Sequence, residues 1–216
     1  MAHGEKPNTK HWQRKVVAKK LYLKTYGCQM NVADSELVSR ILAEAGHQII
    51  EAPDKAEVIL LNTCAVREHA EERVIGRASQ LYGLRNRTPN LTIGILGCMA
   101  QHLAKSLPQR APFVDLVMGP DSYRRLPQIL ADTAEETLLD LRLSRDENYV
   151  GIDPVRKVGT NAWVTIIRGC DKFCTFCIVP YVRGRERSVD SGEILRLCLL
   201  YTSPSPRDAT LSRMPS

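Results

Sequence analysis

Three cysteines lie within one stretch of eight residues, Cys170, Cys174 and Cys177, in the spacing CxxxCxxC. Thiolates at this density favour the binding of soft metals, which means zinc, copper(I) or an iron-sulfur cluster. Three thiolates on a four-iron cluster would leave one iron open for a substrate. These cysteines are therefore the first candidate site for chemistry.

A helix and a zinc site are the two other interpretations of this segment. In a helix, the spacing would place the three thiols on one face, where cysteine packs as a small apolar residue. Gly169, Thr175 and Pro180 instead favour a loop. Zinc usually takes four ligands in two pairs, and the nearest histidine in the sequence is His102. The residues thus favour an iron-sulfur cluster.

Cys28, Cys64 and Cys98 each follow an apolar run and precede a helical pattern. Strands that alternate with helices predict a parallel sheet, and the carboxyl ends of its strands share one edge. We therefore expect three thiols that are distant in sequence to converge on one site. Taken singly, each of them is equally well a buried structural cysteine.

The expected fold class is α/β, with an open parallel sheet in the N-terminal domain. Strands are expected at residues 21–28, 58–64, 91–98, 114–118 and 162–167. Helices are expected from Asp34 or Ser35 to Gly46, at 66–83, at 99–107 before Pro108, at 123–130, and from Ser191 with Asp190 or Ser191 as its cap.

Composition points to an intracellular protein. No apolar run approaches the ~20 residues that span a bilayer, and the N-terminus lacks the apolar core of a signal peptide, so we expect a cytoplasmic location and no membrane partner. Seven cysteines without an export signal favour reduced thiols. A net charge of +6 is compatible with a nucleic-acid partner, although many basic proteins bind none.

Changes in composition along the chain suggest five segments. They are a basic flexible arm (1–19), the N-terminal α/β domain (20–132), an acidic and irregular linker (133–160), the start of a second domain (161–195) and a tail that resembles non-native read-through (196–216). A disordered natural tail is the alternative for the last segment. Cys198 lies in it and is not counted as a candidate ligand.

Four motifs carry a resemblance to a known family. They are Thr-Tyr-Gly-Cys-Gln-Met-Asn (25–31), Asn-Thr-Cys-Ala-Val-Arg-Glu (62–68), Gly-Cys-Met-Ala-Gln (97–101) and Arg-Gly-Cys-Asp-Lys-Phe-Cys-Thr-Phe-Cys-Ile-Val-Pro-Tyr-Val-Arg-Gly (168–184). Together they resemble the methylthiotransferases of the radical S-adenosylmethionine superfamily, and most closely the branch that modifies tRNA. The resemblance covers about residues 20 to 195.

The resemblance implies two 4Fe-4S clusters. Cys170, Cys174 and Cys177 would hold the cluster that binds S-adenosylmethionine, and the cofactor would carry the hard chemistry. The second, auxiliary cluster would be held by the three earlier cysteines, Cys28, Cys64 and Cys98. One S-adenosylmethionine would donate a methyl group to a sulfur at the auxiliary cluster, and another would give the radical that activates the adenine.

The implied activity is the transfer of a methylthio group to C2 of N6-isopentenyladenosine in tRNA. The implied partners are tRNA and a flavodoxin-like electron-transfer protein, and the expected state is a monomer. In this family the chain continues through the rest of a radical (β/α) barrel and a small RNA-binding domain. Neither follows Leu195, so we expect the fragment itself to be inactive.

Two rival functions remain open at this stage. The first is the sister methylthiotransferase that modifies an aspartate of a ribosomal protein; Gln-Met-Asn after Cys28 and Ala-Val-Arg-Glu after Cys64 favour the tRNA branch. The second is a non-enzymatic iron-sulfur or RNA-binding protein. Iron content and substrate assays distinguish all three.

A few polar residues near the cysteines carry weaker signals. Asn31 and Asn62 are candidates for hydrogen bonds to cluster sulfurs, although asparagine more often caps a turn. Tyr181 is a candidate for stacking on a nucleobase, or simply a packed aromatic. Three arginines after the cysteine loop are candidates for RNA phosphate contacts, or solvated charges: Arg183, Arg185 and Arg187.

Overall fold

The computed structural model describes residues 17–65, 68–131, 137–156 and 161–201. Of the predicted basic arm, only residues 17–19 fall within this part of the chain. Most of the predicted tail, residues 202–216, also lies outside the described residues. Among the described helices, none is long and apolar enough to cross a membrane.

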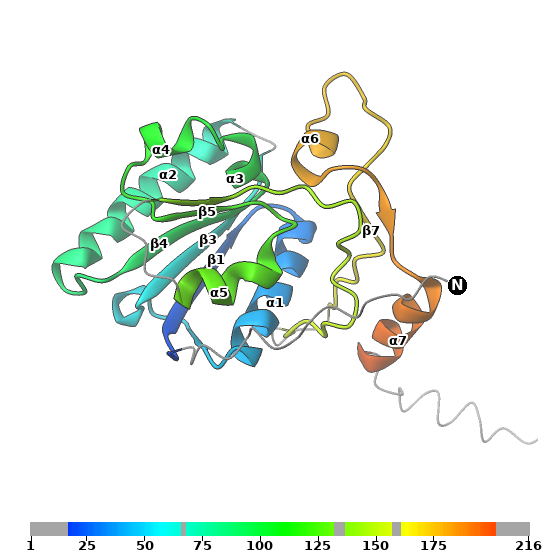
Figure 1. Ribbon diagram of the computed structural model, residues 1–216, viewed down its shortest axis with the longest axis horizontal. Coiled ribbons are helices and arrows are strands. Elements are labelled where there is room, and N and C mark those ends of the chain that lie inside the picture. The colour runs from blue at the N-terminus through cyan, green and yellow to red at the C-terminus, as the bar shows by residue number, and fades with distance from the viewer. Residues whose placement is uncertain (1–16, 66–67, 132–136, 157–160, 202–216) are drawn as a thin grey trace, which may run out of the picture.

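Six parallel strands form one sheet in the order β2-β1-β3-β4-β5-β6 (Figure 1). The strands are β1 (Lys20–Tyr26), β2 (Gln48–Ile50), β3 (Val58–Thr63), β4 (Thr92–Gly97), β5 (Leu116–Met118) and β6 (Leu138–Asp140). Every pairing in this sheet is parallel. The predicted α/β fold class with an open parallel sheet is confirmed.

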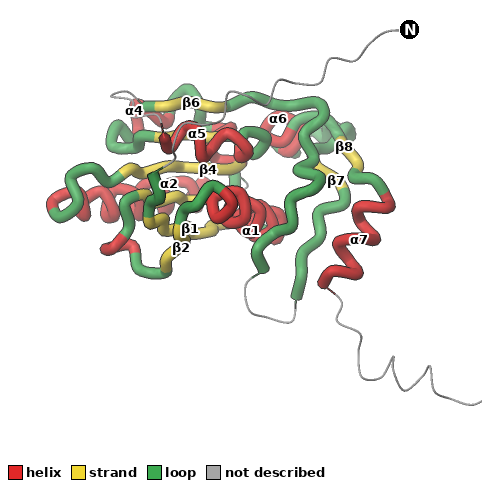
Figure 2. The backbone as a smooth tube through the Cα atoms, turned by 60° about the horizontal axis from the view of Figure 1, so that its bottom comes forward, coloured by secondary structure: helices red, strands yellow, loops and turns green. Residues whose placement is uncertain are grey.

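Helices cover both faces of the sheet (Figure 2). One face packs against α1 (Gln29–Glu44) and α5 (Leu126–Ala131), and the other packs against α2 (Glu68–Tyr82), α3 (Cys98–His102) and α4 (Leu107–Arg110). Short 3-10 turns complete the connections at Pro53–Lys55, Gly83–Asn86 and Tyr123–Arg125. Because both faces are buried, all six residues of β3 are buried, which explains the unbroken apolar run in its sequence.

The sheet reverses its winding direction between β1 and β3. From β1 the chain moves to β2 at one edge, and it then adds β3, β4, β5 and β6 on the other side. Open α/β sheets bind their ligands outside the carboxyl ends of the strands at such a switch point. The residues that follow β1 and β3 therefore occupy the position where a functional site is expected.

Several predicted element boundaries need correction. The first long helix begins at Gln29 rather than at Asp34 or Ser35, so Cys28 is its N-cap residue. The helix predicted over residues 99–107 is two short helices, and Pro108 lies in the first turn of the second one, where its missing N–H costs nothing. The patterns also missed β2 and β6, which are only three residues long. Strand β6 lies within the segment predicted as a linker.

The C-terminal segment lies beside the carboxyl edge of the sheet (Figure 1). It contains β7 (Ile167–Arg168), α6 (Val179–Arg183), β8 (Arg187–Ser188) and α7 (Ser191–Tyr201). The strand predicted over residues 162–167 is wrong in extent, because β7 has two residues and pairs antiparallel with β8. A strand needs a hydrogen-bonded neighbour, and among the described residues this pairing extends from β7 only to Ile166, whose carbonyl accepts from the N–H of Val189 at 2.9 Å. Asp190 caps α7, since it accepts a hydrogen bond from the N–H of Gly192 at 2.8 Å.

Candidate functional site

Cys28, Cys64 and Cys98 follow three strands that are neighbours in the sheet. Cys28 is the N-cap residue of α1 after β1, Cys64 follows β3, and Cys98 is the first residue of α3 after β4. The expected placement at one sheet edge is thus observed. We call these residues the sheet-edge cysteines, and Cys170, Cys174 and Cys177 the loop cysteines.

The thiols of Cys28 and Cys64 are hydrogen-bonded to each other, and this contact is the main reason that the pKa of Cys28 falls to about 5. Burial acts in the opposite direction, while the backbone N–H groups of Asn31 and Met30 and the charge of Arg183 lower the pKa further. A thiol with this pKa is largely a thiolate at neutral pH. Thiolate is the form that binds metals.

Two buried asparagines tie the first two strand ends together. Asn31 donates from Nδ2 to Asn62 Oδ1 at 3.2 Å and to the carbonyl of Thr63 at 3.0 Å, and Asn62 donates back to the carbonyl of Asn31 at 2.9 Å. Asn31 Oδ1 also lies 3.4 Å from the Cys28 sulfur. Asn31 therefore lies beside a candidate ligand sulfur, and Asn62 holds it in place. Their hydrogen bonds to cluster sulfurs stay a prediction.

Two glycines allow the strand ends to approach this closely. A Cβ at Gly97, whose φ is +92°, would lie 2.5 Å from Asn62 Oδ1 and 2.6 Å from the Thr63 carbonyl oxygen. A Cβ at Gly27 would lie 2.7 Å from Asn31 Oδ1 and 2.8 Å from the Cβ of Cys64. Glycine is required at both positions because a Cβ at Gly97 would collide with the residues just before Cys64, and a Cβ at Gly27 would collide with Cys64 itself.

Cys98 differs from Cys28 in its surroundings. It is buried, and burial raises the pKa of its thiol even though the nearby Arg183 charge acts to lower it. Arg183 Nε lies 3.1 Å from the Cys98 sulfur and donates a hydrogen bond to it. Val182, from the same short helix, packs with Ala65 and Cys98. The α6 segment therefore closes over this end of the sheet.

The loop cysteines lie between β7 and α6. Cys174 is exposed, and Cys170 and Cys177 are half-buried. The backbone N–H of Cys177 donates to the carbonyl of Cys174 at 2.9 Å, and that of Cys170 donates to the carbonyl of Gly184 at 3.2 Å. Gly169 turns the chain at φ +75°, where a Cβ would collide with the backbone of Arg185. The predicted loop, rather than a helix, is observed.

The donor chemistry of both groups fits an iron-sulfur cluster. No cysteine of the described residues is in a disulfide, and each group offers three sulfurs, one group at a sheet edge and one in an accessible loop. In the part of the chain that the structure describes, however, no three His, Cys, Asp or Glu side chains come close enough to hold one metal ion. The cysteines are therefore near one another in the fold without being gathered as a ligand set.

Asp34 anchors both ends of the cysteine loop. Its carboxylate is fully buried on α1 and accepts from Arg168 Nη1 at 2.9 Å and from Arg183 Nη2 at 2.8 Å. Arg168 precedes Cys170 by two residues, and Arg183 follows Cys177 by six. Burial acts to raise the pKa of Asp34, but the two guanidinium charges outweigh it and keep that pKa below its ordinary value. The carboxylate is thus charged and doubly paired.

A second buried ion pair secures the end of the loop. Arg187 donates from both terminal nitrogens to the carboxylate of Asp121, at 2.7 and 3.0 Å. Arg183 and Arg187 are therefore buried structural residues, and neither the predicted phosphate contact nor the solvated charge applies to them. Arg185 is exposed and pairs with Asp171 at 2.9 Å, so it alone of the three keeps the predicted character.

Asp34 was missed by the sequence prediction although a signal was present. It stands at the start of the spacing Asp34, Leu37, Val38 and Ile41, which is one face of a helix. The three apolar residues are core residues of α1. A charged residue on an apolar helix face is costly unless it is paired, so its position alone indicates a buried partner.

Exposed aromatic rings gather on the cysteine loop. Phe173 and Tyr181 meet edge to face with ring centroids 6.0 Å apart, and the guanidinium of Arg185 lies 5.2 Å from the Phe173 centroid. Phe176, directly before Cys177, is 95% exposed. The predicted role of Tyr181 as a stacking partner remains a prediction, and its exposure is compatible with it.

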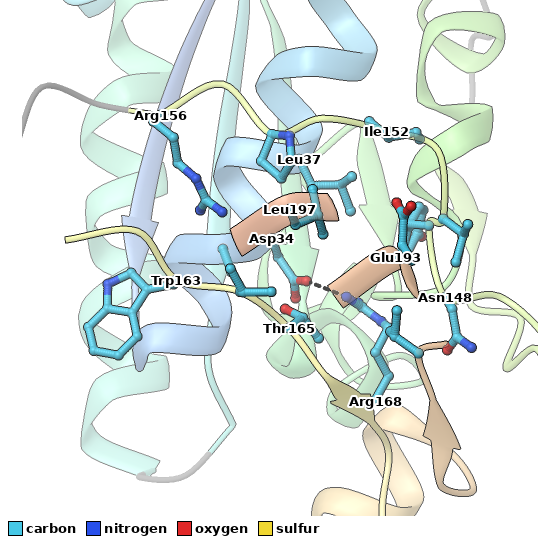
Figure 3. Close-up of a pocket in the computed structure, with 16 residues that line it drawn as sticks. Asp34, Leu37, Asn148, Ile152, Arg156, Trp163, Thr165, Arg168, Glu193 and Leu197 are labelled. Atoms are coloured by element: carbon cyan, nitrogen blue, oxygen red, sulfur yellow. Dashed lines mark hydrogen bonds and ion pairs between the residues drawn. The ribbon is translucent and has the colours of Figure 1, made fainter. Parts of the chain in front are cut away.

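A small pocket lies next to the Asp34 anchor (Figure 3). It is formed by α1, the connection around residues 148–156, the segment 163–168 and α7. Figure 3 shows Asp34 and Arg168 paired at its floor, with Trp163 and Arg156 at one side. None of the six candidate cysteines is among the described residues that line it, so it is distinct from the cysteine sites.

Comparison with known proteins gives a consistent result. Residues 20–119 match the family described as "Uncharacterized protein family UPF0004". Proteins called tRNA-2-methylthio-N(6)-dimethylallyladenosine synthase are similar to most of the chain: that of Chloroherpeton thalassium is 48% identical over 194 residues, which are 89% of this chain and 43% of the relative.

Two further relatives with the same name extend this result. The protein of Amoebophilus asiaticus is 44% identical over 208 residues, or 95% of this chain and 43% of the relative. That of Bacteroides fragilis is 40% identical over 196 residues, or 89% and 43%. The chain thus spans less than half the length of the curated relatives it matches.

Proposed function

We propose that the full-length protein is a tRNA methylthiotransferase, because residues 20–119 match the UPF0004 family and most of the chain is similar to proteins named as tRNA-2-methylthio-N(6)-dimethylallyladenosine synthases. It transfers a methylthio group to C2 of N6-isopentenyladenosine in tRNA. The observation that carries this proposal is the identity of 40–48% over about nine-tenths of the chain to proteins with that name.

The six candidate cysteines would hold two 4Fe-4S clusters in this protein. The loop cysteines would bind the cluster that takes S-adenosylmethionine, and the sheet-edge cysteines would bind the auxiliary one. Together these groups supply radical chemistry, which an aromatic C–H requires because it offers no acidic proton and no leaving group. The chemistry of the thiols supports this assignment: the low pKa of Cys28 provides a thiolate, and the charge of Arg183 favours an anion beside Cys98.

The chain's own residues would position these groups. Asp34, through Arg168 and Arg183, holds both ends of the cysteine loop against the helix that Cys28 caps. Asn31 and Asn62 hold the first two strand ends together. The exposed rings of Phe173, Phe176 and Tyr181 would exclude water and offer surfaces on which an adenine can stack.

The proposed partners are tRNA and a flavodoxin-like electron donor, and we propose a cytoplasmic monomer. The basic net charge of +6 supports a polyanionic substrate. Arg185 is available for phosphate contacts because it is exposed at the end of the cysteine loop.

A substrate assay tests the proposal. The full-length protein is reconstituted with iron and sulfide and given S-adenosylmethionine with either isopentenylated tRNA or the ribosomal protein that the sister enzyme modifies. We expect the methylthio product only in the tRNA, detected by mass spectrometry of its nucleosides. Modification of the ribosomal protein alone would overturn the assignment in favour of the sister activity, and a protein that binds iron but modifies neither would favour the non-enzymatic alternative.

A further inference from the structure

Arg183 makes contact with both regions that carry cysteines. It ends α6 in the segment that follows the loop cysteines, and its Nε donates to the sulfur of Cys98 at 3.1 Å. Its Nη2 donates to Asp34 Oδ2 at 2.8 Å. Only 5% of the residue is exposed. Its geometry is therefore fixed by two partners in the sheet domain.

The carboxylate that pairs with Arg183 has a second buried partner. Arg168 and Arg183 are both buried and share the single carboxylate of Asp34. The two other buried pairs nearby are already complete, because Arg187 faces Asp121 and Arg156 faces Glu36. Tyr123 and Tyr149 face the same region as neutral groups, because burial raises the pKa of both hydroxyls. Asp34 thus divides its charge between two guanidiniums, and that of Arg183 also faces the sulfur of Cys98.

A hydrogen-bond donor is left over at this place. Nη1 of Arg183 is buried and has no hydrogen-bond partner among the described residues. A buried, charged donor without a partner is costly. A sulfur acceptor of a cluster bound at the sheet edge would give this donor a partner and would lie beside the guanidinium charge.

We propose that Arg183 is a positioning residue for the sheet-edge cysteines. Its guanidinium holds the sulfur of Cys98 and supplies the positive charge that an anionic cluster needs there. The inference rests on the auxiliary cluster proposed above. It places beside that cluster a residue, Arg183, from the segment that follows the loop cysteines. Hydrogen bonds to cluster sulfurs and nearby charge set reduction potentials. Since reduction adds negative charge, a guanidinium stabilises the reduced cluster more than the oxidised one.

The test measures the reduction potential of the auxiliary cluster alone. The parent for this test is the full-length protein in which the loop cysteines Cys170, Cys174 and Cys177 are changed to alanine. It is reconstituted with iron and sulfide. A redox titration followed by electron paramagnetic resonance gives the potential. We expect Arg183→Gln to lower it by the equivalent of about tenfold in the reduction equilibrium, which is about 59 mV for a one-electron couple. Arg183→Lys keeps the charge and is expected to lower it less.

The matched control is Arg185→Gln, which removes an exposed guanidinium from the same segment and should leave the potential unchanged. An Arg183→Gln protein with the parent's iron content and the parent's potential would overturn the inference. If Arg183→Gln does not fold, as judged by circular dichroism, Arg183→Lys decides: a lowered potential supports the role, and an unchanged one rejects it. A parent protein without iron would overturn the auxiliary-cluster assignment itself.

Discussion

The two groups of cysteines are positioned by opposite means. The sheet-edge cysteines are 34 to 70 residues apart in the sequence, and adjacent parallel strands bring them together. The loop cysteines lie within eight residues, and a glycine turn and the chain itself keep them close. One group therefore depends on the folded sheet, whereas the other needs only a local turn and an anchor.

This difference shows where each site is vulnerable. The sheet-edge cysteines are surrounded by buried hydrogen bonds of Asn31 and Asn62 and by a glycine that admits no side chain. The loop cysteines have aromatic neighbours that are exposed, and two buried arginines secure the loop to Asp34. A substitution can therefore damage one group, the other, or the Asp34 contact that links them.

Removing either group should have the largest effect. With alanine at all three positions of one group, we expect the iron of the full-length protein to fall from about eight to about four atoms per chain, and tRNA modification to be lost. Colorimetric iron analysis after anaerobic reconstitution measures this. Unchanged iron after loss of the sheet-edge group would show that the two groups are not equivalent ligand sets.

Breaking the link between the groups should have the next largest effect. Asp34→Asn leaves two buried guanidiniums without their carboxylate, and the loss of one partner of a buried ion pair costs about 3–5 kcal/mol. Urea unfolding measures the loss. Glu44→Gln is the control, because the pair of Glu44 with Arg40 is exposed on the same helix and should be worth under about 0.5 kcal/mol. Equal losses for the two variants would contradict the anchoring role of Asp34.

A glycine substitution separates the two means of positioning. Gly97→Ala places a Cβ within 2.6 Å of two atoms at the sheet edge, and such overpacking costs about 1–3 kcal/mol. Gly46→Ala is matched to it, since Gly46 has φ +88° but nothing within 4 Å of an added Cβ. We expect Gly97→Ala to destabilise the chain by about 2 kcal/mol more than Gly46→Ala in urea unfolding. A difference near zero would mean that the strand ends are not closely packed.

The smallest expected effect comes from the opposite edge of the sheet. Burial, followed by the charge of Lys19, lowers the pKa of His47, whose Nδ1 accepts a hydrogen bond from the backbone N–H of Lys19 at 3.2 Å. The folded state thus favours the neutral ring. The contribution of the neutral ring to the free energy of unfolding is present above the unfolded pKa of about 6.5 and is lost as the pH falls below that value. Unfolding of His47→Gln should show a weaker loss of stability as the pH falls below about 6.5. The same slope in both proteins would contradict this.

Much of the fold could be predicted from local patterns. The apolar runs before Cys28, Cys64 and Cys98 predicted three strands correctly, because strands buried on both faces have few polar residues. Strands β2 and β6 were missed because each is a short edge strand that is only partly buried, whereas β5, of the same length, is fully buried and lies in an apolar run. The strand expected at 162–167 was wrong in extent. An apolar run indicates a buried segment, but a segment becomes a strand only where a neighbouring strand hydrogen-bonds to it, and β8 pairs only with residues 167 and 168.

The sequence by itself determined which residues are candidates for metal-binding thiols: the spacing of Cys170, Cys174 and Cys177 predicts them, and so does a cysteine after each of three strands. Only the tertiary structure decided which charges surround them. In the sequence, Arg183 and Arg187 look like surface residues. In the structure both are buried, and they form ion pairs with Asp34 and Asp121. The physical reason is that burial of a charge depends on a partner from a distant part of the chain, and spacing along the chain does not encode that partner.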